Sequence, residues 1–213
     1  MSDLFGLVKA EDVAGLEAAL KGADLTRLHN EAGESLYRFA LFHGHAKAAE
    51  TIKALGVFGL HDAALTGDLA RVEALLKAAP WAIDMLSPDG WTALHLAAFM
   101  GMDTAVEALL KHGANARIMS RAFEQNMPMH AAAAGRRIGM GAYAKLVAET
   151  GVDALQKQGY TALMIAASNG FTAAVEVLLA AGADKSIKLA GGKTAADIAA
   201  DRGHTELAKL LAP

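Results

Sequence analysis

Short apolar stretches at helical spacing recur along the chain, separated by glycines and polar loops. In the clearest example, residues 90–116, Thr92 opens an apolar run that ends at Gly101, and a second run places Val106, Leu109 and Leu110 on one face. A threonine hydroxyl accepts hydrogen bonds from backbone amides at a helix start, and glycine adopts the left-handed conformation common at a helix end. The pattern predicts two short helices joined by a tight turn.

The same pattern returns at a fixed distance. Residues 90–116 align without gaps on residues 159–185, with 14 identities in 27 positions at an offset of 69 residues. A period of about 33 residues indicates a repeat protein whose units stack on one another. We predict a single domain, 1–213, with seven units at residues 1–29 (N-terminal cap), 30–56, 57–86, 87–117, 118–155, 156–188 and 189–213 (C-terminal cap).

These residues resemble the ankyrin repeat, whose first helix opens with T-x-L-H and carries paired alanines. Thr92 to His95 and Ala97–Ala98 match that opening, and the later Gly113–Ala114 matches the Gly-Ala that follows the second helix. The resemblance extends over residues 4–212. It implies an all-α solenoid of stacked antiparallel helix pairs, with β-turn fingers projecting between them. Polar and charged residues of the last pair are expected on its outer, capping face: Asp201, Arg202, Thr205, Glu206 and Lys209.

Two units depart from the repeat. Arg38 replaces the histidine of the second unit, so the hydrogen bonding between finger and helix is expected to differ there. In the fifth unit, 16 residues separate His130 from Leu146, against 14 between His95 and Leu109. The extra residues fall in a glycine-rich turn that holds Arg136 and Arg137. This turn is either a flexible basic lobe for an acidic partner or a phosphate, or a tolerated surface insertion.

Composition narrows the classes of function. The net charge is −3, and residues 1–70 hold six Lys or Arg against ten Asp or Glu, so no basic stripe for nucleic acid is expected. The chain has no cysteine, which excludes disulfides and thiolate chemistry. No apolar run is long enough to span a membrane, and the first residues do not resemble a signal peptide. We expect a monomeric, soluble, cytoplasmic protein.

Two features resemble catalytic or metal motifs, and neither is complete. Gly192-Lys193-Thr194 is the end of a phosphate-binding loop, but Ile187 occupies the position of its first glycine. The repeat instead explains this stretch as a finger and a helix start. The eight histidines include no i, i+4 pair with a third ligand, so structural roles are expected and no metal or cofactor is predicted.

The concave groove is the expected binding surface, because the resemblance places the residues after the finger glycines and at the ends of the first helices there. An apolar strip in that groove would be an exposed surface suited to a partner, with aromatic anchors and adaptable methionines. The alternatives are that these side chains only pack between units, or that binding uses the convex side or the Arg136–Arg137 turn. The candidate residues are Glu34, Phe42, His43, Leu65, Trp91, Phe99, Met100, Asn126, Tyr160, Ser168 and Asn169.

The predicted function is a non-enzymatic adaptor or regulatory protein that binds another protein through its concave groove and finger tips. The main alternative is a small-molecule or phosphate site, possibly catalytic, at the fifth-unit insertion, formed by Arg136, Arg137 and His130. A third possibility is an assembly role through self-association. Fold alone does not choose a partner.

Overall fold

The computed structural model describes residues 3–21, 29–56, 58–122, 125–137 and 139–212. Within these ranges the chain forms fourteen α-helices, which pack as seven consecutive pairs. The first three pairs are α1 (Leu4–Lys9) with α2 (Val13–Leu20), α3 (Leu36–Phe42) with α4 (Ala46–Ala54), and α5 (Leu60–Thr66) with α6 (Leu69–Ala78). The others are α7 (Ala93–Met100) with α8 (Asp103–Lys111), α9 (Pro128–Gly135) with α10 (Met140–Thr150), α11 (Ala162–Ser168) with α12 (Thr172–Ala180), and α13 (Ala195–Asp201) with α14 (Thr205–Leu211).

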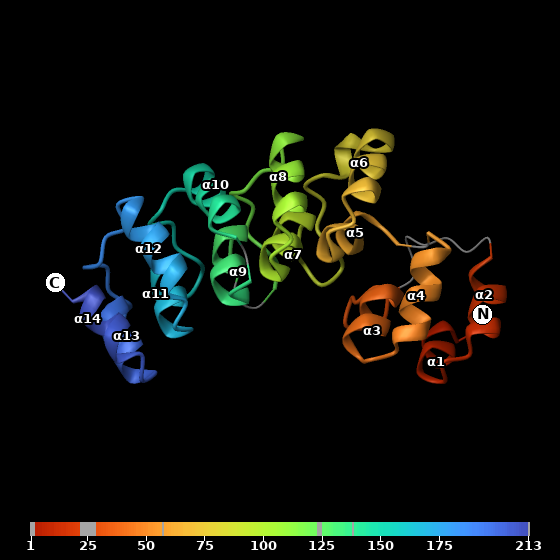
Figure 1. Ribbon diagram of the computed structural model, residues 1–213, viewed down its shortest axis with the longest axis horizontal. Coiled ribbons are helices and arrows are strands. Elements are labelled where there is room, and N and C mark those ends of the chain that lie inside the picture. Colours follow the sequence, from red (N-terminus) through yellow and green to blue (C-terminus); the bar gives the residue numbers. More distant parts are fainter. Residues whose placement is uncertain (1–2, 22–28, 57, 123–124, 138, 213) are drawn as a thin grey trace.

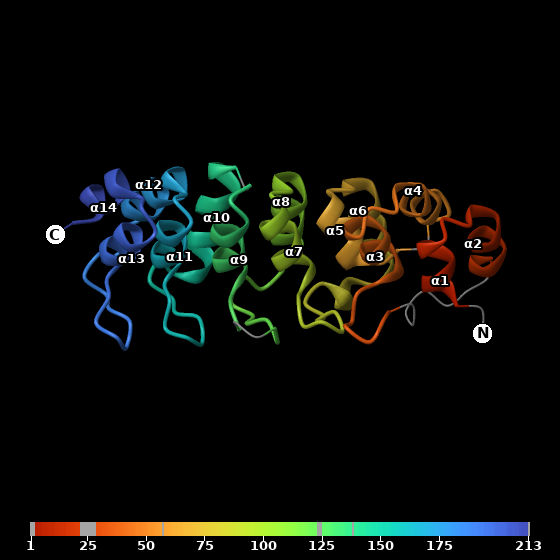
Figure 2. The same cartoon turned by 90° about the horizontal axis from the view of Figure 1, so that it is seen from below.

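The pairs stack into an arch (Figure 1), with α5, α7, α9 and α11 on its inner side and α6, α8, α10 and α12 on its outer side. Figure 2 shows the loops between consecutive pairs projecting together from one edge of the helical layers. The predicted all-α solenoid of stacked helix pairs is therefore confirmed. Each helix pair lies within one of the seven predicted ranges, although the exact limits of the units remain a prediction.

Local sequence sets the helix ends as expected. The Thr92 hydroxyl accepts a hydrogen bond from the backbone amide of His95, and Thr161 does the same for Met164. Gly101 ends α7 with φ of 73°, a left-handed conformation that side chains disfavour. Asp3 caps the first helix by accepting from Gly6 N at 2.9 Å.

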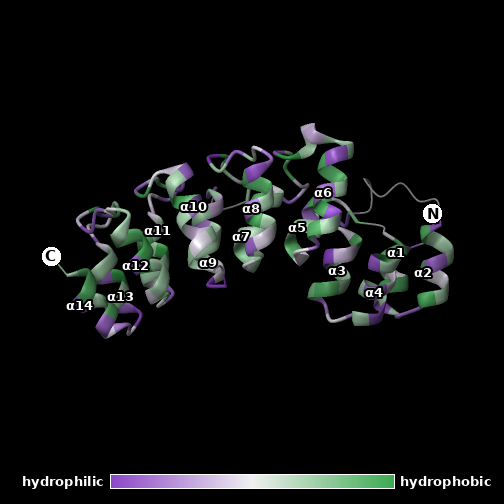
Figure 3. Cartoon of the chain, turned by 45° about the horizontal axis from the view of Figure 1, so that its top comes forward, coloured by the Kyte–Doolittle hydropathy of each residue, from purple (hydrophilic) through white to green (hydrophobic). Residues whose placement is uncertain are grey.

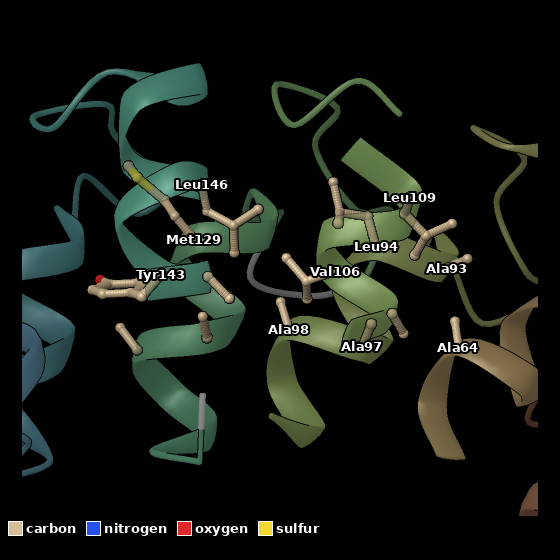
Figure 4. Close-up of a cluster of buried hydrophobic side chains, with 14 of the residues drawn as sticks. Ala64, Ala93, Leu94, Ala97, Ala98, Val106, Leu109, Met129, Tyr143 and Leu146 are labelled. Carbon is tan, nitrogen blue, oxygen red and sulfur yellow. The ribbon is translucent and has the colours of Figure 1, made fainter. Parts of the chain in front are cut away.

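The core lies between the two helical layers and between neighbouring pairs (Figure 4). Ala97 and Ala98 are fully buried, because small side chains allow α7 to pack closely against α5 and α9. Val106 and Leu109 of α8 are also fully buried. Figure 3 shows hydrophobic residues concentrated in the helices, while the projecting loops are largely hydrophilic. This separation of apolar and polar residues is what excludes water from the stack.

Fingers are closed by the same backbone hydrogen bond in successive units. Ser87 N donates to Trp91 O at 2.7 Å, and Gln156 N donates to Tyr160 O at 3.0 Å. Neighbouring fingers are also joined, since Arg121 N donates to Gly90 O at 2.8 Å. These bonds hold the fingers in a fixed row.

Histidines at the helix starts connect each unit to the next finger. His95 Nε2 lies 2.9 Å from Asn126 O, His130 Nε2 lies 2.9 Å from Ala154 O, and His61 has the same contact with Met85 O. The expected structural role of these three histidines is therefore confirmed.

The junction between the second and third pairs is built differently. Arg38 is 3% exposed and donates to both oxygens of Asp89 and to Gly33 O. The Asp62 carboxylate lies 3.8 Å from Arg38 Nε, and it accepts a hydrogen bond from Ser35 Oγ at 2.7 Å. Burial raises the pKa of Asp62, and Ser35 and Arg38 act in the opposite direction. Polar bonds thus replace the alanine packing seen elsewhere.

The fifth-unit insertion lies in the turn between α9 and α10. This turn spans residues 136–139, against 101–102 in the preceding pair. A Cβ added to Gly135 would overlap the carbonyl oxygen of Phe99, and Gly139 N donates to Asp103 Oδ1 at 2.8 Å. The insertion therefore packs directly against the end of α7 and the start of α8.

Candidate functional site

Two rows of side chains occupy equivalent positions in the fingers and at the ends of the first helices, which form the inner layer of the arch (Figure 1). One row is the finger residue just before each first helix: Glu34, Trp91, Asn126 and Tyr160. The other row is the last turn of each first helix, where Phe42 ends α3 and Met100 ends α7. The sequence placed these residues at equivalent positions, and the helix limits agree.

Exposed aromatic rings at the helix ends are the main apolar feature of this face. The Phe42 residue is 52% exposed and Phe99 is 42% exposed. Neither ring belongs to the hydrophobic core cluster of the described residues. Packing between units therefore does not account for these two exposed rings.

Trp91 and Tyr160 are only partly exposed. The Trp91 ring lies edge-on to the His95 ring, with 5.6 Å between centroids, and Tyr160 packs against the core. Both rings thus combine a structural contact with an exposed surface. Rings fixed in this way lose little conformational entropy on binding, as expected of interface anchors.

Two of the predicted groove residues are not available for contact. Leu65 is 1% exposed, so its assignment to an exposed strip was wrong. The reason is the next unit: α5 packs along α7, and the Met102 side chain reaches Gly67 at the end of α5, so this end is covered rather than open. Asn126 is also buried, because its side-chain oxygen accepts from Ser120 Oγ and helps to close the finger.

Glu34 and His43 lie together at the second unit. Glu34 Oε2 accepts from Asn30 Nδ2 at 2.8 Å and is 3.7 Å from His43 Nε2. The finger and the helix end are therefore within contact distance across the groove. Both side chains are accessible, which gives this end of the groove a polar rim.

A hollow of about 450 Å³ lies between the fifth and sixth units. Asn169 Nδ2 is 3.5 Å from Ala133 O, and Ser168 O accepts from His204 Nε2 at 3.2 Å, so polar bonds join three consecutive pairs around it. It brings together four of the candidate groove residues and five other residues. The hollow is lined by Asn126, Tyr160, Ser168 and Asn169, together with His130, Ala134, Gln156, Ile165 and Arg202.

Arg202 is a correction to the sequence analysis, which placed it on the outer face of the last pair. It is the C-cap residue that directly follows α13, and it lines the hollow beside α11. The helical pattern of the last unit alone could not show this, because the hollow depends on the contact between α11 and α13. The sequence signal that could have placed Arg202 in the groove is its equivalence to Gly135 and Asn169, which occupy the same position in the fifth and sixth units.

Arg136 and Arg137 are both exposed in the turn after α9. Arg137 Nη1 lies 3.7 Å from Met100 Sδ, so the insertion contacts a residue of the predicted groove. His130 is six residues before Arg136, about 9 Å along the helix axis, and is 0% exposed. The three residues proposed for a ligand site therefore do not converge on one point.

Buried histidines in this region are neutral. Burial lowers the pKa of His95 and of His130 to about 4, although each ring's hydrogen bond to a backbone carbonyl acts in the opposite direction. In His95, Nε2 donates to the Asn126 carbonyl, so Nδ1 accepts from the Thr92 hydroxyl at 2.7 Å. Both ring nitrogens are occupied, which leaves this histidine no capacity for ligand binding.

Within the described ranges, no group of three or more His, Asp or Glu side chains is arranged to hold a metal ion. No helix among the same residues combines the length and the apolar character needed to cross a lipid bilayer. Lys193 of the incomplete phosphate motif lies in the last finger and forms an ion pair with Asp201 of α13, with 2.5 Å between Nζ and Oδ2.

The sequence analysis missed one large exposed ring. Trp81 lies in the short 3₁₀ helix η2 (Pro80–Ala82), which follows α6, and is 73% exposed. Met85, four residues later, is also exposed. These residues come after a second helix rather than a first one, so they belong to neither row of the inner face.

Comparison with known proteins agrees with this architecture. The family "Ankyrin repeats (3 copies)" matches the chain in three overlapping segments, residues 12–120, 60–153 and 129–213. The chain is 31% identical over 213 aligned residues to "Ankyrin repeat protein nuc-2" of Neurospora crassa, covering 82% of this chain and 20% of that protein. It is 28% identical over 229 aligned residues to "Nuclear factor NF-kappa-B p105 subunit" of Gallus gallus, covering 98% of this chain and 23% of that protein. The chain thus spans about a fifth of the length of these relatives, and it belongs to the ankyrin repeat family.

Proposed function

We propose that the chain is a non-enzymatic adaptor or regulatory module that binds another protein through its concave groove and finger tips. Ankyrin repeats are generally protein–protein interaction modules. The observation that carries the proposal is the pair of exposed rings, Phe42 and Phe99, at equivalent ends of the first helices α3 and α7. Aromatic side chains of this kind are frequent interface anchors, and each commonly contributes about 2 kcal/mol or more on truncation.

The row of fingers supports the proposal further. Hydrogen bonds between fingers and from His95 and His130 to the next finger fix the row before any partner binds. A surface ordered in advance loses less entropy on binding, which favours affinity. We propose binding across the second to sixth units, by a monomer in the cytoplasm.

The whole-protein roles of the relatives do not transfer to this chain. The chain covers 20% of the nuc-2 protein and 23% of the p105 subunit, so most of each relative lies outside the alignment. From these relatives we propose only that this chain uses its ankyrin array as a binding scaffold. The partner's identity is left to experiment.

The test is affinity capture from a lysate of the source cell, followed by mass spectrometry. Wild type is compared with a Trp91→Ala/Phe99→Ala/Tyr160→Ala variant whose circular dichroism spectrum and melting profile show that it is folded. Trp81→Ala is the matched control, because it removes an exposed aromatic ring outside the inner face. We expect partners captured by wild type and by Trp81→Ala to be lost from the groove variant.

Retention of the same partners by the folded groove variant would contradict the proposal. Loss of partners only from Trp81→Ala would move the binding surface to η2. Light scattering at high protein concentration tests the monomeric state, and a stable dimer would contradict that part of the proposal.

A further inference from the structure

Several exposed basic side chains lie on the fingers and at the first-helix ends of the later units. The second finger holds Glu31 and Glu34, whereas the later fingers hold Arg121 and Lys157. Arg136 and Arg137 follow α9, and Arg202 follows α13. All of the basic residues named here are exposed, and none forms an ion pair with another of the described residues.

The hollow between the fifth and sixth units holds one charged group. Arg202 lines it, and its guanidinium makes no hydrogen bond or ion pair within the described part of the chain. His130 is neutral near pH 7 because burial lowers its pKa to about 4. The remaining lining is neutral, with amide, hydroxyl and apolar side chains. The hollow is therefore a polar site with a single uncompensated positive charge.

That arrangement matches a carboxylate in charge and in hydrogen bonding. A free guanidinium can donate two parallel hydrogen bonds to one carboxylate. Asn169 and Ser168 line the same hollow, and their amide and hydroxyl groups can donate to the same ligand. The single positive charge of Arg202 neutralises a carboxylate, which carries one negative charge, but it neutralises only half the charge of a phosphate dianion.

We propose that the hollow binds an aspartate or glutamate side chain from an extended acidic segment of the partner protein. The segment continues past the basic side chains of the fingers, Arg121 and Lys157, and of the turn after α9, Arg136 and Arg137, while Phe99 and Tyr160 contact its apolar side chains. The inference rests on the proposed use of the inner face and adds the partner's chemistry. Complementary charge of this kind selects partners and speeds association, and it weakens with salt.

The test is a selection of random dodecapeptides displayed on phage against the full chain, followed by fluorescence anisotropy with the selected peptides. We expect enrichment of Asp and Glu in the selected sequences. Arg202→Glu should weaken their binding by roughly tenfold to a hundredfold, the range expected for a lost charge-assisted hydrogen bond. Lys111→Glu is the matched control, because it makes the same charge change at the exposed end of α8 in the outer layer.

Further outcomes separate this inference from the proposed function. Replacing the acidic residues of a selected peptide by Lys should restore binding to Arg202→Glu, which a merely unfolded variant could not do. Selected peptides that lack acidic residues, or that bind wild type and Arg202→Glu equally well, overturn the inference. Groove binding still stands in that case if the same peptides do not bind the Trp91→Ala/Phe99→Ala/Tyr160→Ala variant. Preferential selection of phosphopeptides in a parallel array overturns the carboxylate assignment. If wild type selects no peptide, both this inference and binding of linear segments by the groove are contradicted.

Discussion

Arg38 donates to Asp89 across 51 residues of sequence, with Nη1 2.8 Å from Oδ2 and Nη2 3.1 Å from Oδ1. The arginine is in the second unit and the aspartate is in the finger of the fourth, so the bond passes over the unit between them. Asp89 also accepts from Ser87 Oγ at 2.5 Å. The pair therefore joins the N-terminal units to the rest of the solenoid by charge rather than by alanine packing.

Replacing Arg38 by alanine should destabilise this junction strongly. Asp62 and Asp89 would lose their common cation, and breaking a buried ion pair in this way costs about 3 kcal/mol or more. Urea unfolding measures the loss, and Lys47→Ala on the exposed side of α4 is the control, with an expected change within about 0.5 kcal/mol. Equal stability of Arg38→Ala and wild type would show that the ion pair does not hold the junction.

Amide hydrogen exchange should locate the same effect. In Arg38→Ala, residues 29–56 should exchange faster, because they are attached to the later units mainly through this polar network. Residues 140–212 should exchange as in wild type, since units of a solenoid contact only their neighbours. Uniformly faster exchange along the chain would contradict a local junction.

Tyr143→Phe should stabilise the protein. Tyr143 is 0% exposed, its hydroxyl has no hydrogen-bond partner among the described residues, and burial raises the pKa of that hydroxyl above its usual value. In Figure 4 its ring points toward the side of the stack where α11 and α12 follow. Removing an unsatisfied buried hydroxyl should raise the free energy of unfolding by about 1 kcal/mol.

Tyr37→Phe, the same substitution at a second buried tyrosine, should have the opposite effect to Tyr143→Phe. Tyr37 is also buried, but its hydroxyl is not among the buried groups that lack a hydrogen-bond partner in the described part of the chain, and nearby Thr66 opposes the rise that burial causes in its pKa. Its removal should lower the free energy of unfolding by about 1 kcal/mol. If both tyrosines responded alike in chemical denaturation, hydrogen bonding of the hydroxyl would not be the deciding factor.

Acid should destabilise the stack through its buried histidines. The pKa of His95 and of His130 is about 4 in the folded protein, against about 6.5 in the unfolded chain, so the unfolded chain binds more protons between these values. Above pH 6.5 the histidines have no effect, and below it stability falls by about 1.4 kcal/mol per pH unit for each histidine until about pH 4.

The pH effect is measured as the difference between wild type and His95→Gln/His130→Gln, in which the contributions of other titrating groups cancel. Melting temperatures between pH 4 and pH 8 should fall less steeply on acidification in the variant. Parallel curves for the two proteins would show that these histidines are not the acid-sensitive groups.

Gly135→Ala and Gly141→Ala should have opposite effects. A Cβ at Gly135 would overlap Phe99 O, so α9 would have to move away from α7, at a cost of about 1–3 kcal/mol. A Cβ at Gly141 meets nothing within 4 Å, and alanine in a helix gains about 0.5 kcal/mol over glycine. Thermal unfolding of the two variants tests whether the insertion is held against α7, and tolerance of Gly135→Ala would argue that it is not.

Local features were predictable from the sequence because they depend on a few adjacent residues. Thr92 and Gly101 define the ends of α7 through their own hydrogen bonding and conformation. Arg38 could be recognised as a departure, but its partner Asp89 could not, since the contact depends on how three units are oriented. The burial of Leu65 and the placement of Arg202 depend on the same contacts between units.

The inner face as binding surface is tested most directly by hydrogen–deuterium exchange of the protein alone and in complex with a captured partner. We predict that binding slows exchange in residues 87–100, 126–135 and 156–169, which hold the fingers and first helices around Trp91, Phe99 and Tyr160. Exchange in α6, α8 and α10 should change little. Slower exchange confined to these outer helices, or to the segment around Trp81, would contradict binding through the groove.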